Sequence, residues 1–166
     1  MIDEQLRVLR VMNEAAGRLD FNEFAKMVGL TPSATMDTLK ELANTGHVRK
    51  VGGGYGLTEK GKAVLKAVTR VPEGAEFVFY TGIGQPTGLS AASPKEFYEA
   101  AKKVDVSSLE FHLSRGDFEN WVLALLKDDA LAIDLENLRR GELKGESLRE
   151  KLASVIEDRY GADALL

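Results

Sequence analysis

The amino-acid sequence predicts a mainly α-helical protein with small β-hairpins, an α+β fold. Apolar residues recur at helical spacing along most of the 166 residues, often after a residue that can cap a helix N-terminus. Two segments break this pattern. A glycine run at 52–54 lies between two strand-like stretches, and an apolar run at 77–80 precedes a glycine-rich turn. Each predicts a hairpin within a helical chain.

The N-terminal segment predicts two helices. Residues 2–16 place most of their apolar side chains on one helical face, and Gly17 can end that helix in a left-handed conformation. Leu19 and Phe21 alternate with polar residues, which predicts a very short strand. Asn22 can then cap the second helix.

A third helix, a hairpin and a last helix follow. Thr31 and Pro32 predict the start of the third helix, with Thr as the N-cap and Pro at the first helical position, and Gly46 ends it. Residues 47–58 predict a hairpin whose tip is the glycine run, and a last helix is expected at 59–68.

This order of elements over residues 2–68 resembles the winged helix-turn-helix family of microbial, archaeal-type transcription regulators. The most specific part is LKELANTGHVRKVGGGYGLTEKGKAVL, where a helix, a basic strand and a glycine-tipped hairpin follow one another. The resemblance implies that the helix from Pro32 to Asn44 enters the major groove of duplex DNA, with Asp37 also facing outward. The DNA-binding residues that it implies are Ser33, Thr35, Thr38, Arg49, Lys50, Tyr55, Lys60 and Lys62.

The sequence departs from this family pattern in two ways. The outward face of the third helix has no Arg and carries Asp37 and Glu41, and the tip of the hairpin is bare glycine. Arg is the commonest reader of guanine, and acids are repelled by phosphates. Weak contacts per chain favour a homodimer that occupies two half-sites. Leu123 and Ile133, off the main apolar stripes, are candidate dimer surface.

Charge and composition divide the chain near residues 70–74. Residues 1–70 carry a net charge of +3 and residues 71–166 a net charge of −7, and a Pro and a Gly lie at the change. We expect a winged helix-turn-helix DNA-binding domain at 1–70 and a mainly helical domain at 75–166. A mildly basic module joined to an acidic one suits a nucleic-acid-binding protein with a second function.

The second domain is expected to begin with a short hairpin and to continue as helices. Three Ser-x-x-Glu capping boxes, Ser93/Glu96, Ser107/Glu110 and Ser147/Glu150, predict helix starts. The second box favours a helix over 109–113, although these residues alternate like a strand. The turn at Thr87-Gly88, the segments Ser108-Leu-Glu-Phe-His112 and Asp117-Phe118-x-x-Trp121, and a terminal helix with Leu148-Arg149 follow one another in this domain. Through them residues 76–158 resemble a small family of uncharacterised microbial domains, a resemblance that supplies no established activity.

The residues His112, Arg115, Asp117 and Trp121 are the candidate ligand site of this second domain. A His, an Arg, an Asp and an aromatic ring can recognise a small anion. A structural reading stays open: the His packs, the Asp caps a helix and the Trp belongs to the core. The glycine-rich turn at 82–88 lacks the Gly-Lys-Ser/Thr ending of a phosphate loop, which favours a hairpin turn.

Composition argues against several other functions. The chain has no cysteine, and its two histidines are too few for a histidine-rich metal site. We expect neither an enzyme nor a cofactor. No apolar run approaches the roughly 20 residues that span a bilayer, and the first residues lack signal-peptide features, so a cytoplasmic protein is expected. The sequence therefore predicts a DNA-binding regulator whose second domain mediates dimerisation or effector response. The alternatives are a protein-interaction adaptor or a small-anion-binding second domain.

Overall fold

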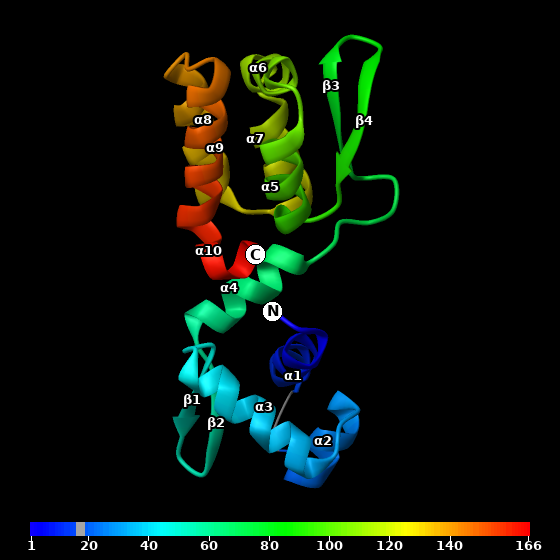
Figure 1. Ribbon diagram of the computed structural model, residues 1–166, viewed down its shortest axis with the longest axis vertical. Coiled ribbons are helices and arrows are strands. Elements are labelled where there is room, and N and C mark those ends of the chain that lie inside the picture. Colours follow the sequence, from blue (N-terminus) through cyan, green and yellow to red (C-terminus); the bar gives the residue numbers. More distant parts are fainter. Residues whose placement is uncertain (16–18) are drawn as a thin grey trace. The chain divides into compact units, whose positions relative to one another are not determined.

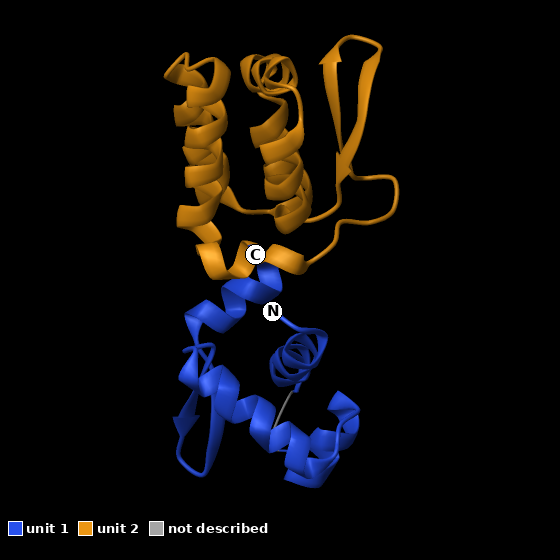
Figure 2. Cartoon of the chain, viewed as in Figure 1, with its two compact units in different colours: residues 1–66, 166 blue, residues 67–165 orange. Residues whose placement is uncertain are grey.

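The computed structural model describes residues 1–15 and 19–166 of the chain (Figure 1). The chain divides into two compact units (Figure 2). We call residues 1–66 with Leu166 the N-terminal unit and residues 67–165 the C-terminal unit. Both units are mainly α-helical and each contains a two-stranded antiparallel hairpin, which confirms the predicted fold class.

The N-terminal unit packs three helices around a small apolar core and adds a hairpin and a further helix. Its elements are α1 (Asp3–Glu14), α2 (Phe21–Val28), α3 (Pro32–Asn44), β1 (Val48–Val51), β2 (Gly54–Leu57) and α4 (Glu59–Val68), whose end passes into the C-terminal unit. Leu9 of α1, Val28 of α2 and Leu42 of α3 are fully buried where these helices meet. The predicted hairpin and last helix are confirmed.

The start of α2 differs from the prediction. Phe21 does not belong to a strand but is the first residue of α2, and Asp20 rather than Asn22 occupies the N-cap position. The alternation of Leu19 and Phe21 with polar residues suggested a strand, but the partner of Phe21 is Phe24, one turn further along the helix. Their ring centroids lie 6.4 Å apart. The predicted helix end at Gly17, and Ala16 on the apolar face, lie outside the described residues.

The signals at both ends of α3 are confirmed. Thr31 Oγ1 accepts a hydrogen bond from the Ala34 N–H at 3.1 Å, and Pro32 is the first helical residue. At the other end Gly46 has a φ of 80°, a left-handed conformation that glycine adopts without strain. These local signals set the direction in which the chain enters β1.

The C-terminal unit packs helices against one hairpin (Figure 1). Its elements are β3 (Phe77–Gly82), β4 (Gln85–Ala91), α5 (Pro94–Lys103), α6 (Val106–Arg115), α7 (Asp117–Trp121), the π-helix η1 (Val122–Leu126), α8 (Asp129–Arg140), α9 (Gly145–Tyr160) and α10 (Ala162–Leu165). β3 packs on α6, β4 packs on α5, and α9 packs on α5, α6 and α8. The helical interpretation of 109–113 is confirmed, since these residues lie in α6.

Aromatic rings form the core next to the hairpin. The centroid of the Phe77 ring lies between 4.8 and 5.7 Å from those of Phe79, Phe97, His112, Phe118 and Trp121. Such close, mostly edge-to-face pairs add to the apolar burial. The core therefore surrounds the imidazole of His112, which is only 4% exposed.

Two of the three predicted capping boxes are wrong. Ser93 caps α5 as expected and accepts from the Glu96 N–H at 3.2 Å. In contrast, the N-cap of α6 is Asp105, whose carboxylate accepts from both the N–H and the hydroxyl of Ser107. The Glu110 carboxylate, free of the expected box, accepts from the Gly145 N–H at 2.9 Å.

The remaining predicted caps also differ. Ser147 lies inside α9, which begins at Gly145. The N-cap of α7 is Gly116, and Asp117 is the first helical residue. Asp117 is not available as a cap because its carboxylate bonds to His112 and Arg115 instead.

Candidate nucleic-acid interface and candidate ligand pocket

The helix α3 has one buried and one exposed face. The buried face carries Thr35, Thr38, Leu39 and Leu42. The exposed face carries Ser33, Asp37, Lys40, Glu41 and Asn44. Only the second set can meet a ligand of the N-terminal unit.

The prediction that Thr35 and Thr38 face outward is wrong. Their exposed fractions are 0% and 5%. The hydroxyl of Thr35 donates to the Thr31 carbonyl at 2.8 Å, and that of Thr38 donates to the Ala34 carbonyl at 2.9 Å. Because the carbonyl one turn back accepts each hydroxyl, a threonine can lie in a helix–helix contact without an unsatisfied group. These two residues therefore support the fold of α3.

Sequence reasoning missed Lys40. This lysine is exposed and follows Ser33 by seven residues, which places both on one helical face with Asp37 between them. Among the described residues Lys40 has no ion-pair partner. Helical spacing counted from the N-cap could have identified it. The exposed face of α3 thus carries one cation as well as the two acids.

The hairpin β1–β2 presents two basic side chains. Val48 is buried and anchors β1, while Arg49 and Lys50 are exposed. Lys50 lies opposite Tyr55, which is half-buried, whereas Arg49 lies opposite Gly56. Because Gly56 has no side chain, no side chain lies directly opposite Arg49 on the partner strand. Both cations lie on a short ribbon that packs against α3 through β1.

The base of this hairpin is fixed to α4 by a close backbone approach. The Thr58 hydroxyl donates to the Gly46 carbonyl at 2.6 Å and accepts from the Gly61 N–H at 3.2 Å. A Cβ on Gly61 would lie 2.3 Å from the carbonyl oxygen of His47, far inside contact distance. The Thr-Glu-Lys-Gly segment of the family-like motif therefore has a structural role, which is to hold the hairpin in place.

The two lysines predicted behind the hairpin already have partners within the protein. Lys60 Nζ donates to the Thr45 carbonyl at 2.8 Å, at the C-terminal end of α3. Lys62 Nζ forms an ion pair with Glu59 at 3.1 Å. Both side chains are exposed, but a phosphate would have to compete with these bonds. Lys60 and Lys62 are weaker candidates for DNA contact than Arg49 and Lys50.

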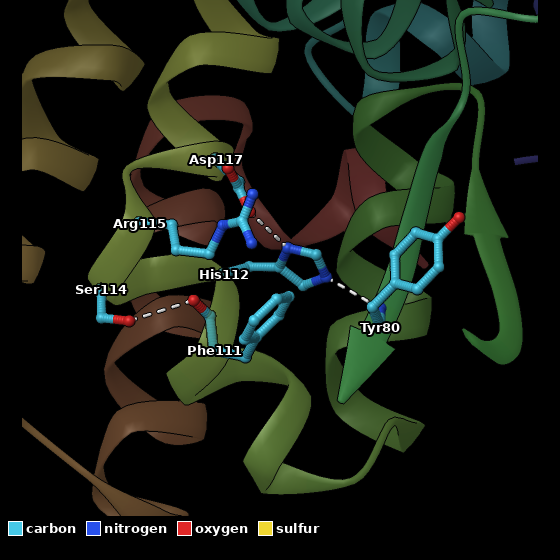
Figure 3. A network of polar contacts seen from close by, with 6 residues as sticks. All are labelled: Tyr80, Phe111, His112, Ser114, Arg115 and Asp117. Carbon is cyan, nitrogen blue, oxygen red and sulfur yellow. Dashed lines mark hydrogen bonds and ion pairs between the residues drawn. The ribbon is translucent and has the colours of Figure 1, made fainter. Parts of the chain in front are cut away.

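In the C-terminal unit the four predicted site residues lie close together. His112 Nδ1 lies 2.8 Å from Asp117 Oδ2, and the same oxygen lies 3.3 Å from Arg115 Nε (Figure 3). The Tyr80 N–H donates to His112 Nε2 at 2.8 Å. Since Nε2 accepts, the hydrogen of the imidazole is assigned to Nδ1, where it is donated to Asp117.

Trp121, the fourth of these residues, has both a core and a pocket side. Its Nε1–H donates to the Ala75 carbonyl at 2.9 Å, and its ring stacks on Phe97 with centroids 5.8 Å apart. The structural reading of this residue is therefore correct. Its ring also forms part of a cavity wall.

An open cavity of about 580 Å³ lies beside these residues, between β3 and α6. The four predicted residues line it, together with Tyr80 and Phe111. Its remaining lining residues are Glu76, Phe77, Val78, Gly82, Ile83 and Gly84. Sequence reasoning missed the β3 side of this cavity because no local pattern links β3 to a helix that begins more than twenty residues later.

The contacts of His112 in this cavity suit a structural role. Both ring nitrogens of His112 are engaged by the protein and the ring is buried, so the imidazole cannot act as a base without breaking one of these bonds. Arg115 is half-exposed and Asp117 partly buried.

Other kinds of site were sought over residues 1–15 and 19–166. Within these ranges, His, Asp and Glu side chains form no group of three or more that could hold a metal ion. Over the same part of the chain, none of the helices has both the length and the apolar character that a membrane crossing requires. Comparison of the chain with family models, curated proteins and solved structures found no significant match.

Proposed function

We propose that the protein is a DNA-binding transcription regulator whose N-terminal unit contacts duplex DNA through α3 and the hairpin β1–β2. The observation that carries the proposal is the pair of exposed cations on the hairpin, Arg49 and Lys50, beside a helix whose N-terminal end is also exposed. Among the described residues neither cation has an ion-pair partner. Unpaired cations on a protruding ribbon suit contact with a phosphate backbone.

The exposed N-terminus of α3 adds a second kind of contact. Thr31, Pro32 and Ser33 are all exposed, so the first turn of the helix is open to a ligand. Backbone N–H groups at a helix N-terminus bind phosphate oxygens, and the hydroxyl of Ser33 can donate to a phosphate or a base edge. Lys40, further along the same face, supplies a third cation.

The acids on the same face limit the affinity of one chain. Asp37 and Glu41 are exposed beside Ser33 and Lys40, and each costs binding energy near a phosphate. We therefore propose that a homodimer occupies two half-sites, with the C-terminal unit mediating dimerisation or effector response. Leu123 and Ile133 of that unit are exposed apolar side chains that a dimer could bury. Such a regulator acts by binding, without catalysis or a cofactor, in the cytoplasm.

A salt titration of binding to duplex DNA tests this proposal on the full chain. The logarithm of the binding constant should fall linearly with the logarithm of salt concentration. Arg49→Ala and Lys50→Ala should each weaken binding and reduce the slope by about 1. Lys103→Ala, which removes an exposed lysine of the C-terminal unit, is the matched control and should change neither.

Two outcomes would overturn the proposal. The first is the absence of binding to either random or promoter duplexes at low salt, which would favour a winged helix that serves as a scaffold for protein contacts. The second is an equal effect of Lys103→Ala and the hairpin variants, which would mean that binding depends on charge alone. Asp37→Asn gives an independent readout, since removal of this acid should tighten DNA binding.

A further inference from the structure

We infer that the cavity between β3 and α6 binds a small monocarboxylate with an apolar or aromatic body, whose carboxylate is held by Arg115. This inference names the chemical class of effector in the proposed function and rests on it for the regulatory role. Binding in the cavity itself is independent of DNA, because all the lining residues belong to the C-terminal unit.

The guanidinium of Arg115 is held in a fixed orientation. Its Nε lies 3.3 Å from Asp117 Oδ2, and its central carbon lies 4.8 Å from the centroid of the Phe111 ring. Asp117 is fixed in turn by His112, whose ring is buried in the aromatic core. Figure 3 shows the guanidinium beside Asp117 and His112, on the side of α6 that faces β3. An arginine held in this way loses little side-chain entropy when a ligand binds.

The two terminal nitrogens of Arg115 remain available. Within the described residues Arg115 forms an ion pair with Asp117 through Nε, and its terminal nitrogens donate no hydrogen bond to the protein. The side chain is 50% exposed at the cavity. Two parallel N–H groups of a guanidinium match the two oxygens of a carboxylate, a geometry that a lysine cannot offer.

The other charges of the cavity disfavour a ligand with more than one negative charge. Glu76 and Asp117 line the cavity with Arg115, so the formal charge of the lining is −1. Asp117 shares the charge of Arg115 and also accepts the His112 hydrogen bond, so a bound carboxylate would share the guanidinium with Asp117. A phosphate with two charges would meet repulsion from Glu76 that one cation does not offset, whereas a single carboxylate needs only the open side of Arg115.

The wall of the cavity on the hairpin side is apolar and exposed. Ile83 at the hairpin turn is 87% exposed, and Val78 is also exposed. Residues 77–92 contain no charged side chain, although 29% of the whole sequence is charged. With Tyr80 and Phe111 these residues offer an apolar surface to the body of a ligand, and a volume of about 580 Å³ is typical of small-molecule sites.

The single tryptophan of the chain, Trp121, lines this cavity and reports on its occupation. Three probes share one aromatic body and differ in charge: 3-phenylpropionate, its neutral amide and 3-phenylpropylamine. We expect the carboxylate to change the Trp121 emission saturably in the full chain without DNA. The amide and the amine should bind at least tenfold more weakly, because the amide has one uncharged acceptor oxygen in place of two charged ones and the protonated amine accepts no hydrogen bond.

Variants assign the binding to Arg115. Arg115→Gln should weaken binding of the carboxylate at least tenfold. Arg115→Lys, which keeps the positive charge but lacks the two parallel N–H groups, should weaken binding by a smaller factor. Arg140→Gln is the matched control, because Arg140 is an exposed arginine of the same unit that does not line the cavity. Ile83→Asp, at an exposed turn, should also weaken binding of the carboxylate without affecting the fold.

The inference fails if none of the three probes changes the emission, if the amine binds more tightly than the carboxylate, or if Arg140→Gln matches Arg115→Gln. Failure here and failure of the proposed function are distinguishable. The salt titration with DNA needs no carboxylate, and the emission assay needs no DNA. Carboxylate binding by a chain that does not bind DNA would leave the cavity as a ligand site and overturn only the regulatory role.

Discussion

The backbone N–H of Tyr80 in β3 donates to Nε2 of His112 in α6 at 2.8 Å, across 32 residues of sequence. The opposite ring nitrogen donates to Asp117 at the start of α7. One imidazole therefore joins a strand, a helix and the next helix, and its ring packs against both Phe77 and Phe118. The same contacts that make His112 structural also orient Asp117 and, through it, the arginine at the cavity.

Replacement of His112 by Ala should destabilise the C-terminal unit. The change leaves the Tyr80 N–H without a partner, removes the His112 bond to Asp117 and opens a void in the aromatic core, at a cost of about 3 kcal/mol. Urea denaturation followed by Trp121 fluorescence measures this loss. Ser114→Ala, an exposed position of the same helix, should stay within about 0.5 kcal/mol of the unmodified chain. Equal stabilities for the two variants would show that the His112 bonds are not needed.

Gly61→Ala should be destabilising, although alanine normally stabilises a helix relative to glycine by about 1 kcal/mol. The added Cβ would lie 2.3 Å from the carbonyl oxygen of His47, and this backbone atom cannot move away as a flexible side chain can. We expect a loss of about 2 kcal/mol, measured by thermal unfolding in far-ultraviolet circular dichroism. Gly53→Ala is the control, since no atom lies within 4 Å of its added Cβ. Stabilisation by Gly61→Ala would contradict the close approach of α4 and the hairpin.

The sequence predicts the N-terminal unit well because its signals are local. Thr31 bonds to a group three residues away, and Gly46 needs only its own backbone conformation. In the C-terminal unit, Ser107 and Glu110 match a local pattern but do not form it. The Asp105 carboxylate accepts from the Ser107 N–H, which the capping box would have paired with Glu110. The Glu110 carboxylate instead accepts from the N–H of Gly145, 35 residues away. The competition from Asp105 is local, whereas the contact with Gly145 is tertiary and leaves no trace in a short window of sequence.

The candidate ligand site likewise contains residues that are close in sequence and residues that only tertiary packing brings together. His112, Arg115 and Asp117 lie within six residues, so a single turn between two helices brings them together, and the sequence could predict their cluster. Tyr80 and Ile83 come from a distant hairpin, and only the packing of β3 on α6 places them beside Arg115. Thr35, Thr38 and Ser33 of α3 all carry a hydroxyl group, so residue type does not distinguish them as candidate DNA contacts. They differ in burial, since both threonines are buried and Ser33 is exposed.

Thr35→Val and Ser33→Ala should separate the stability of α3 from its proposed contact with DNA. Thr35 is fully buried, and the Thr31 carbonyl that accepts its hydroxyl also accepts the Thr35 N–H at 2.9 Å. Thr35→Val should therefore cost no more than about 1 kcal/mol and leave DNA affinity unchanged. Ser33→Ala should leave stability nearly unchanged and weaken DNA binding. A loss of affinity in Thr35→Val without a loss of stability would contradict the buried orientation.

Asp128, at the N-cap of α8, should make the C-terminal unit sensitive to acid. Its buried carboxylate accepts from Arg159 Nε at 3.0 and 2.8 Å, from the Leu131 N–H at 3.1 Å and from the Tyr160 hydroxyl at 3.1 Å. Burial by itself raises the pKa of Asp128, but these donors outweigh it and hold the pKa below its ordinary value. The group therefore contributes stability that is present above the unfolded pKa of about 3.9 and is lost as pH falls through the folded pKa.

The stability of Asp128→Asn at two pH values tests this linkage. At pH 7 the variant should be less stable by about 2 kcal/mol, because the charge-assisted bonds from Arg159 and part of the helix cap are lost. The difference should narrow as pH falls through the lowered pKa of Asp128, since the carboxyl of the unmodified chain is then protonated as well. Asp129→Asn, the exposed neighbour, should stay within about 0.5 kcal/mol at both pH values. A difference for Asp128→Asn that keeps its size in acid would mean that its bonds do not depend on the charge.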